Sequence, residues 1–374
     1  MDPRFSNLVE NKGILTFKLE GINVSLANAL RRTIISDIDT VVIKTFPHSE
    51  NKANIMINTT RFNNEILKQR LSSIPIHIED TAMPLDQYVI EVHKKNETDT
   101  IDYVTTEDFK VKNEKTKTYL KPEEVKKIFP PNHITKQYID FVRLNPQLSD
   151  QIDGSEIKLT AKMSVSNAKD DAMYNVVSTC SYKNTIDKIA MQDKKVEYED
   201  ELRKKGLSDE DVIFEVKNWS HLQAKRITIP DSFDFIVETV GVFPNKVILQ
   251  KACQVINSKL QNLIGEEQDD YMSIQKSDTT MPNCFDITLK GEDYTIGKIL
   301  EFYLYEECFN KDKVCTFVGF KKFHPHDDDS IIRIAFKTSV DVDIVKQHLK
   351  NGCLKLIQIY KEISKAFEGE IMSS

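Results

Sequence analysis

The feature that most constrains the fold is a pattern that occurs twice in the chain. Residues 17–32 and residues 287–302 align without a gap: in both, an alternating strand reaches a glycine and is followed by an apolar stripe at helical spacing. Ser25 and Thr295 stand where a helix N-cap is expected. Because a repeated sequence unit indicates a repeated structural unit, we predict an α+β chain with two related lobes.

Composition excludes several classes of protein. The chain has 374 residues, of which 40% are hydrophobic and 29% charged, as in ordinary globular proteins. Its net charge of −7 disfavours a free-standing nucleic-acid binder, so we expect any contact with DNA to be indirect. The six cysteines form no C-x-x-C pair and follow no signal peptide, so we expect reduced, buried thiols inside a cell. No apolar run approaches the length of a membrane span, and we expect no membrane contact.

Each lobe ends in a long amphipathic helix. The first helix has an apolar stripe through Ile256, and the second, over about residues 341–367, has apolar residues at every third or fourth position. The second helix would be about 40 Å long, which is more than a small domain can cover by itself. We therefore expect a pseudo-two-fold dimer within one polypeptide, with Leu26, Leu30 and Ile256 in its apolar seam.

Three segments interrupt the repeated pattern. Residues 94–127 are rich in Lys, Thr, Glu and Asp, and we interpret them as a solvated hairpin or a flexible insertion. Residues 183–217 are dense in charges of both signs and predict an exposed helix with connections. Residues 267–282, which are acidic at first and then contain Ser, Thr and Pro, are the best candidate for a linker between the lobes.

The two copies differ at two adjacent positions of the first helix. The first copy has Arg31 and Arg32 where the second has Glu301 and Phe302, so that only one lobe presents two guanidinium groups. Guanidinium groups suit bidentate capture of carboxylates on a protein partner. Asn28 precedes Arg32 by four residues and shares its face of the helix. The alternative is a solvated charge pair without a partner.

The other candidate metal-binding and phosphate-binding segments are better interpreted as structural features than as functional sites. His324, His326 and the acidic run 327–329 could bind a metal ion, but Pro and Asp also form turns, and we interpret the segment as a hairpin turn. The lysines of residues 110–117 could attract phosphates, but interleaved acids favour a solvated insertion. The chain has no Gly-rich phosphate loop, no G-x-S-x-G and no H-E-x-x-H. We therefore expect no catalytic residue and no cofactor.

Several motifs of the first lobe resemble one protein family. Residues 28–36, Asn-Ala-Leu-Arg-Arg-Thr-Ile-Ile-Ser, resemble the signature of the alpha-type subunits of DNA-directed RNA polymerases, which include the archaeal D-type protein and the third-largest subunit of eukaryotic polymerase II. The segment 58–75 is similar to the "N-T-S…E…H-R-L…I-P" helix of that family, with Gln69 in place of the usual histidine. Residues 167–182 and 233–263 are similar to its later motifs, in the same order.

The second lobe resembles the smaller partner of that family, the archaeal L-type protein and its eukaryotic counterparts. Residues 293–297 stand in the place of "D-H-T-L-G", residues 318–320 in that of "A-G-Y", and residues 324–325 in that of "H-P". The Cys-rich metal loop or iron–sulfur domain of some D-type proteins has no counterpart here. A D-like unit fused to an L-like unit resembles the arrangement in large cytoplasmic DNA viruses.

The resemblance implies an organisation of the whole chain. A D-like dimerisation lobe would comprise residues 1–50 and 226–266 and be interrupted by an inserted, mainly β domain at 51–225. The linker would span 267–282, and an L-like dimerisation lobe would span 283–374.

The resemblance also implies a function, which is that of a non-catalytic assembly platform of a DNA-dependent RNA polymerase. Its partners would be the second-largest subunit, small adaptor subunits and the largest subunit, which carries the catalytic magnesium. By position, Arg31, Arg32 and Asn28 would contact the second-largest subunit, and the setting would be the host cytoplasm or the virion. An internal pseudo-dimer would replace a homo-oligomer. The alternative is a self-contained binding protein or enzyme on a duplicated α+β sandwich.

Overall fold

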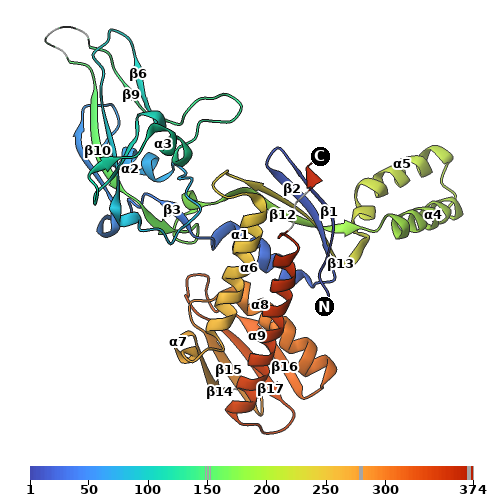
Figure 1. Ribbon diagram of the computed structural model, residues 1–374. Helices are drawn as coiled ribbons and strands as arrows, with labels where there is room; N and C mark the ends of the chain where they lie inside the picture. Colours follow the sequence, from blue (N-terminus) through green and yellow to red (C-terminus); the bar gives the residue numbers. More distant parts are fainter. Residues whose placement is uncertain (148, 150, 152, 278–280, 369–371, 374) are drawn as a thin grey trace. The chain divides into compact units, whose positions relative to one another are not determined.

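A computed structural model describes residues 1–147, 149, 151, 153–277, 281–368 and 372–373 (Figure 1). The chain divides into two compact units. The first unit contains residues 1–33, 179–238 and 245–374, and the second contains residues 34–178 and 239–244. The chain thus leaves the first unit and returns to it, as expected for a lobe with an inserted domain, while the four predicted domain boundaries stay a prediction.

The first repeat of the first unit is built on a five-stranded sheet of order β12-β13-β2-β1-β18. Strands β1, β2 and β13 are antiparallel neighbours, and β18 runs parallel to β1. Lys12 and Gly13 both have positive φ angles and close the β1–β2 hairpin. The bounds are β1 Arg4–Asn11, β2 Ile14–Glu20, β12 Val177–Ile186, β13 Thr228–Thr239 and β18 Met372–Ser373.

The second repeat has a four-stranded antiparallel sheet of order β14-β15-β17-β16. Its first helix, α8, is followed by a turn of π-helix, η6, and its last helix, α9, ends close to where the apolar periodicity predicts. The bounds are β14 Met272–Lys276, β15 Cys284–Leu289, α8 Tyr294–Leu304, η6 Tyr305–Lys311, β16 Cys315–Lys321, β17 Ser330–Phe336 and α9 Val342–Lys365.

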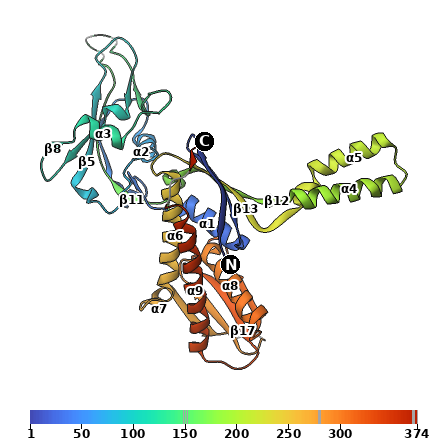
Figure 2. The ribbon, with the colours of Figure 1, turned by 45° about the vertical axis from the view of Figure 1, so that its right-hand side comes forward.

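The long helix of the first repeat, α6 (Asn245–Asn262), packs along α9 of the second repeat, and the two lie side by side in Figures 1 and 2. Both helices bury the apolar stripe that the sequence predicts. Leu26 and Leu30 on α1 (Val24–Ser36) and Ile256 on α6 are all 0% exposed. Tyr360 of α9 is equally buried, and its hydroxyl donates a hydrogen bond of 3.0 Å to the carbonyl oxygen of Leu26.

Residues 183–217 do not form one exposed helix. Strand β12 continues to Ile186, and a helical hairpin of α4 (Lys188–Lys204) and α5 (Asp209–His221) follows. Ser208 caps α5, and Gly206 takes the positive φ that the turn requires. A small core of Leu202, Val212 and Val216 joins the two helices. The predicted exposure is confirmed, since few residues of α4 and α5 are buried, but the single helix was wrong. Three buried apolar residues are too few to show two separate periodic stripes among so many charges.

The predicted linker is partly structured. Residues 267–282 contain α7 (Gln268–Tyr271) and β14, which is the edge strand of the second sheet and pairs with β15 throughout its length. Residues 278–280 of the segment lie outside the described residues. An edge strand needs few apolar residues, because it has one neighbour and most of its side chains are not buried. The sequence of β14 therefore lacks the alternating apolar pattern that would have distinguished it from a linker.

The second unit is mainly β and has its own core. Its largest sheet has the order β4-β10-β5-β7-β8, and the pairs β3–β11 and β6–β9 form two smaller sheets. The bounds are β3 Thr40–Val42, β4 Ala53–Asn58, α2 Asn64–Ser72, β5 Tyr88–Lys95, β6 Asp102–Thr105, β7 Lys110–Asn113, β8 Thr118–Tyr119, α3 Pro122–Ile128, β9 Asp140–Leu144, β10 Glu156–Lys162 and β11 Ser164–Ser166.

The polar tract 94–127 belongs to this folded unit and is not a flexible insertion, and its strands β7 and β8 form an antiparallel hairpin whose tip, residues 114–119, is exposed. It contains strands β6, β7 and β8 and helix α3. Val104, Phe109 and Val111 are each at most 2% exposed and join the core of the unit. The solvated hairpin is therefore present, but these few apolar residues anchor it to the core, and the polar composition of the other side chains concealed that attachment.

Candidate functional site

The candidate site begins at the N-termini of α1 and α8, the two helices that the repeat predicts. Their caps are Asn23 and Asp293, not Ser25 and Thr295. The Asn23 side chain accepts a hydrogen bond of 2.9 Å from the Ser25 amide, and Asp293 accepts one of 2.8 Å from the Thr295 amide. Each helix therefore begins earlier than the sequence predicts, because an Asx side chain caps it two residues upstream. This leaves the hydroxyl of Thr295 available for another contact.

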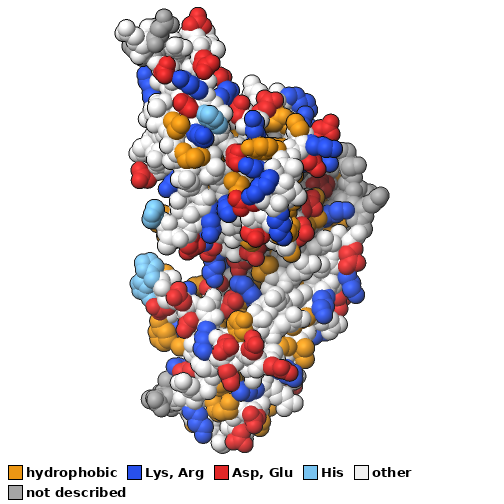
Figure 3. All heavy atoms as spheres, turned by 60° about the vertical axis from the view of Figure 1, so that its left-hand side comes forward, with side chains coloured by type: hydrophobic (Ala, Val, Ile, Leu, Met, Phe, Trp, Pro, Cys, Tyr) orange, Lys and Arg blue, Asp and Glu red, His pale blue; other side chains and the backbone are white. Residues whose placement is uncertain are grey.

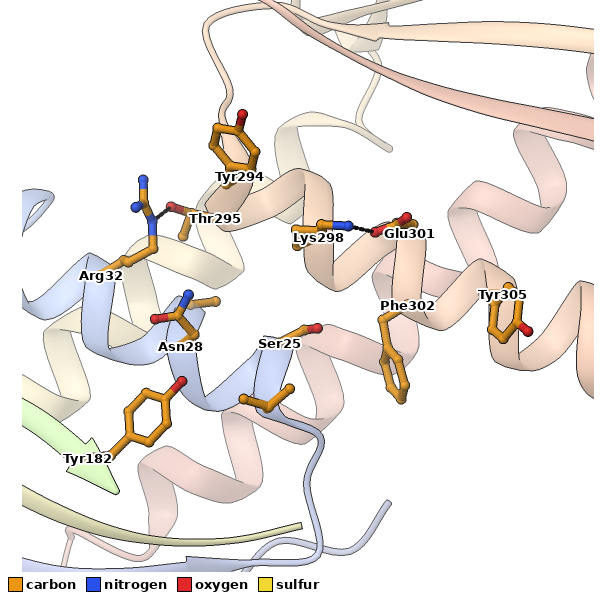
Figure 4. A pocket seen from close by; sticks show the side chains of 12 residues that line it. Ser25, Asn28, Arg32, Tyr182, Tyr294, Thr295, Lys298, Glu301, Phe302 and Tyr305 are labelled. Carbon is orange, nitrogen blue, oxygen red and sulfur yellow. Dashed lines mark hydrogen bonds and ion pairs between the residues drawn. The ribbon is translucent and has the colours of Figure 1, made fainter. Parts of the chain in front are cut away.

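Arg32 makes that contact and joins the two repeats. Its Nε donates a hydrogen bond of 2.9 Å to Oγ1 of Thr295 (Figure 4). Its Nη2 lies 2.6 Å from Oδ2 of Asp293. The side chains of Arg32 and Asp293 are 35% and 31% exposed, so the ion pair is only partly screened by solvent. One guanidinium group thus binds both the cap and the first turn of the helix in the other repeat.

The same contacts set the ionisation of Asp293. Burial acts to raise the pKa of this carboxyl group, but the amide and hydroxyl of Thr295 and the charge of Arg32 outweigh it, and the net pKa is lowered. A lowered folded-state pKa means that the carboxylate stabilises the fold above its ordinary pKa of 3.8. That contribution is lost as pH falls through the folded-state value.

We expect Asp293→Asn to keep the helix cap, because Asn23 caps α1 in the same way, but to lose the ion pair with Arg32. The free energy of unfolding at pH 7 should fall by about 1 kcal/mol. Urea unfolding of both proteins from pH 7 to pH 3 should show this difference shrinking below about pH 3.8, where the carboxyl group of the unfolded chain binds a proton while the native carboxylate, whose pKa is lowered, is still ionised. A difference that is the same at every pH would contradict this assignment.

A groove of about 540 Å³ separates α1 from α8 (Figure 4). Its walls are rich in aromatic side chains, and Tyr294 and Tyr305 remain 49% and 39% exposed. Aromatic residues and arginine are the residue types that contribute most to protein–protein binding energy. The lining residues are Val24, Ser25, Asn28, Ala29, Arg32, Tyr182, Tyr294, Thr295, Lys298, Glu301, Phe302 and Tyr305.

The groove shows how the repeats differ. At one end Arg32 binds Asp293 and Thr295. At the other end its aligned residue, Phe302, lies near Ser25, where it can offer only apolar contact (Figure 4). The two repeats are therefore similar in backbone but not in side-chain chemistry at this position, because the cationic contact of Arg32 is replaced by the aromatic side chain of Phe302.

The structure separates the two arginines that the sequence pairs. Arg32 faces α8, whereas Nε of Arg31 donates a hydrogen bond of 3.0 Å to Oδ1 of Asn28 on its own helix. Burial raises the pKa of Cys180 to about 12, and the nearby charge of Arg31 partly opposes that shift. Arg31 therefore lies on the side of α1 that faces β12. The contact of Arg31, Arg32 and Asn28 with a partner stays a prediction.

Sequence reasoning missed several residues of the groove. Tyr182 comes from β12, more than a hundred residues from either helix in the chain, and no local pattern connects it to the site. Tyr294 and Tyr305 flank the apolar stripe of α8, and their position just outside that stripe was an available signal. Lys298 and Glu301 form an ion pair along α8 in the same wall.

The segment 324–329, which the sequence allows as a metal site or a turn, forms hydrogen bonds with the protein backbone. The Asp327 carboxylate accepts a hydrogen bond of 2.9 Å from the His324 amide, and Asp329 accepts one from the Gly291 amide, as in an ordered turn. In the part of the chain that the structure describes, no group of three or more His, Cys, Asp and Glu side chains is arranged to hold a metal ion. On the face seen in Figure 3, Lys and Arg are interspersed with Asp and Glu.

None of the helices in the described residues combines the length and the apolar character that a membrane crossing requires.

Both repeats match models of known protein families. Residues 16–260 match the model of the RNA polymerase Rpb3/Rpb11 dimerisation domain, and residues 284–366 match a second model with the same description. The two matches contain the two copies of the repeated pattern.

Three relatives are RNA polymerase subunits. Subunit Rpo3 of the DNA-directed RNA polymerase of Pyrococcus horikoshii is 26% identical over 284 residues, which cover 70% of this chain and 96% of the relative. A putative DNA-directed RNA polymerase subunit of Acanthamoeba polyphaga mimivirus is 31% identical over 137 residues, 36% of this chain and 35% of the relative. Human subunit RPAC1 of RNA polymerases I and III is 23% identical over 296 residues, 67% of this chain and 81% of the relative.

Proposed function

Because this chain belongs to the family of the RNA polymerase Rpb3/Rpb11 dimerisation domain, we propose that it is the assembly platform of a multisubunit DNA-dependent RNA polymerase, with both dimerisation partners fused in one polypeptide. It would not be an enzyme by itself, since the nucleotidyl transfer would be carried out by its partners. The relatives named above are all subunits of such polymerases, and they support an alpha-type assembly subunit.

The observation that carries the proposal is the contact between the two repeats. Helices α6 and α9 pack along each other, and Arg32 of the first repeat binds Asp293 and Thr295 of the second. Tyr360 adds a buried hydrogen bond between α9 and α1. These contacts support an internal pseudo-dimer, in which Leu26, Leu30 and Ile256 lie in the apolar seam and the fusion makes a second copy of the chain unnecessary.

The partner-binding face would be that of α1, with Arg31, Arg32 and Asn28 directed at the second-largest subunit. The largest subunit and small adaptor subunits would follow, and DNA would be contacted only through the complex. Aromatic side chains and Arg32 in the adjoining groove support a protein partner. The mimivirus relative supports a viral polymerase, which would act in the host cytoplasm or be packaged in the virion.

The test is affinity purification of the tagged chain from the cells in which it is naturally made, in moderately high salt, followed by mass spectrometry. We expect two very large polymerase subunits near equal stoichiometry with the tagged chain. Recovery of the chain alone, or with unrelated proteins, would favour a self-contained binding protein or enzyme on the same duplicated fold.

A further inference from the structure

Two cysteines and a histidine meet inside the second repeat, in a place that the proposed function does not use. Cys308 lies in η6, Cys315 begins β16, and His348 lies on α9. The Cys308 sulfur is 3.4 Å from Nδ1 of His348, and the Cys315 thiol forms a hydrogen bond with Cys308. Three different elements therefore bring two thiols and an imidazole into contact.

The backbone holds this arrangement in place. The amide of Val314, the residue before Cys315, donates a hydrogen bond of 2.9 Å to the carbonyl oxygen of Cys308. The π-helical turn and the start of β16 are therefore fixed side by side at the two cysteines. Because the Cys315 thiol hydrogen-bonds to Cys308, the two sulfur atoms are neighbours, as a disulfide between them requires.

The contacts also make the two thiols chemically different. The hydrogen bond from Cys315 lowers the pKa of Cys308 to about 5; burial opposes this shift, and His348 supports it. Because Cys315 gives that hydrogen bond and is itself buried, its pKa is raised. At neutral pH Cys308 is thus the nucleophilic thiolate and Cys315 keeps its proton. By contrast, burial raises the pKa of Cys253 and Cys353 to about 12.

We propose that Cys308 and Cys315 are a redox site at which hydrogen peroxide forms a reversible disulfide, with His348 as the proton donor. The Cys308 thiolate attacks one peroxide oxygen, the O–O bond breaks, and the hydroxide that leaves takes a proton from the His348 imidazolium to become water. Cys308 is then a sulfenic acid. The Cys315 sulfur attacks it, the S–O bond breaks, and the departing hydroxyl leaves as water with the Cys315 proton.

Two electrons leave the thiols in this sequence, and one peroxide is reduced to two waters. Because Cys308 and Cys315 are each only 1% exposed, a small oxidant is required, and larger disulfides such as oxidised glutathione would not reach them. The Cys308–Cys315 disulfide would fix the π-helical turn η6, which carries Tyr305. The Tyr305 ring stacks on that of Phe309, with 4.9 Å between the ring centroids, and lines the groove beside α1. This redox site is independent of the proposed polymerase function.

The test is peptide mapping of the intact protein after brief treatment with hydrogen peroxide, removal of the peroxide with catalase, and alkylation of the remaining thiols. We expect a peptide pair joined between Cys308 and Cys315, lighter by two hydrogen masses and restored by dithiothreitol. Cys353 is an internal control, because it is equally buried and lies on α9. Cys308 should react at least about tenfold faster than Cys353.

Two variants separate the steps. Cys315→Ser should accumulate a Cys308 sulfenic acid that dimedone traps, with no disulfide, and His348→Gln should slow Cys308 oxidation about tenfold. Equal rates at Cys308 and Cys353 would overturn the proposal, as would an irreversible sulfinic acid as the first product. A stoichiometric metal ion that protects Cys308, found by elemental analysis of the purified protein, would also overturn it.

Discussion

The variant carrying Leu356→Asp and Ile363→Asp is expected to lose the cooperative thermal unfolding transition of the first unit. Both residues are 0% exposed and lie on the face of α9 that packs against its neighbours. Each substitution removes a packed side chain, at a cost of about 2–5 kcal/mol, and also places a carboxylate where it has neither water nor a cation. The combined loss reaches the total stability of a typical domain, about 5–15 kcal/mol.

The control for this variant lies on the same helix. Leu354 is 49% exposed, so that Leu354→Asp introduces the same charge on α9 without entering the seam. Its melting temperature should stay within a few degrees of the parent, since exposed substitutions usually change stability by less than about 0.5 kcal/mol. The comparison is made by circular dichroism and differential scanning calorimetry. Similar melting curves for the buried and the exposed variants would contradict the paired helices.

The strands and helices of the two repeats were largely predictable because their information is local. Alternation of Leu15, Phe17 and Leu19 predicts a strand with one buried face, and the structure buries all three. The two long helices follow from their periodicity in the same way. The apolar stripes of these two helices also predict that each helix packs against a further surface, because each stripe is longer than a single small sheet can cover. These are properties of ten to twenty consecutive residues, which a single sequence contains.

The site was less predictable because its contacts are distant in the chain. Arg31 and Arg32 look equivalent in sequence, yet consecutive residues on a helix point about 100° apart, and only Arg32 reaches α8. Its partner Asp293 is more than two hundred residues away, and no single sequence shows which of many carboxylates it will meet. The cluster of Cys308 and His348 was missed for the same reason, since its spacing matches no common motif.

This separation of the two arginines changes how partner binding should be tested. Reversing both charges would weaken recruitment of the second-largest subunit if α1 faces it, but Arg32→Glu would also set a carboxylate against Asp293. A loss of binding could then result from altered pairing of the repeats. In the contacts described, Arg31 hydrogen-bonds to Asn28 within its own helix turn and lies on the side of α1 that faces β12, so that Arg31→Glu leaves the Arg32 contact intact.

We expect Arg31→Glu to weaken binding of the second-largest subunit by at least about tenfold. The new carboxylate would repel the carboxylate on that subunit that the guanidinium group is proposed to bind, and would leave it unpaired in a partly buried interface. Lys355→Glu is the matched control, since it makes the same change in net charge on an exposed position of α9. Both variants should melt within a few degrees of the parent. Binding is measured by quantitative pull-down and by biolayer interferometry with the purified second-largest subunit. Equal affinities of the Arg31→Glu and Lys355→Glu proteins would remove Arg31 from the partner-binding face, and the groove aromatics Tyr294 and Tyr305 would then be the next positions to test.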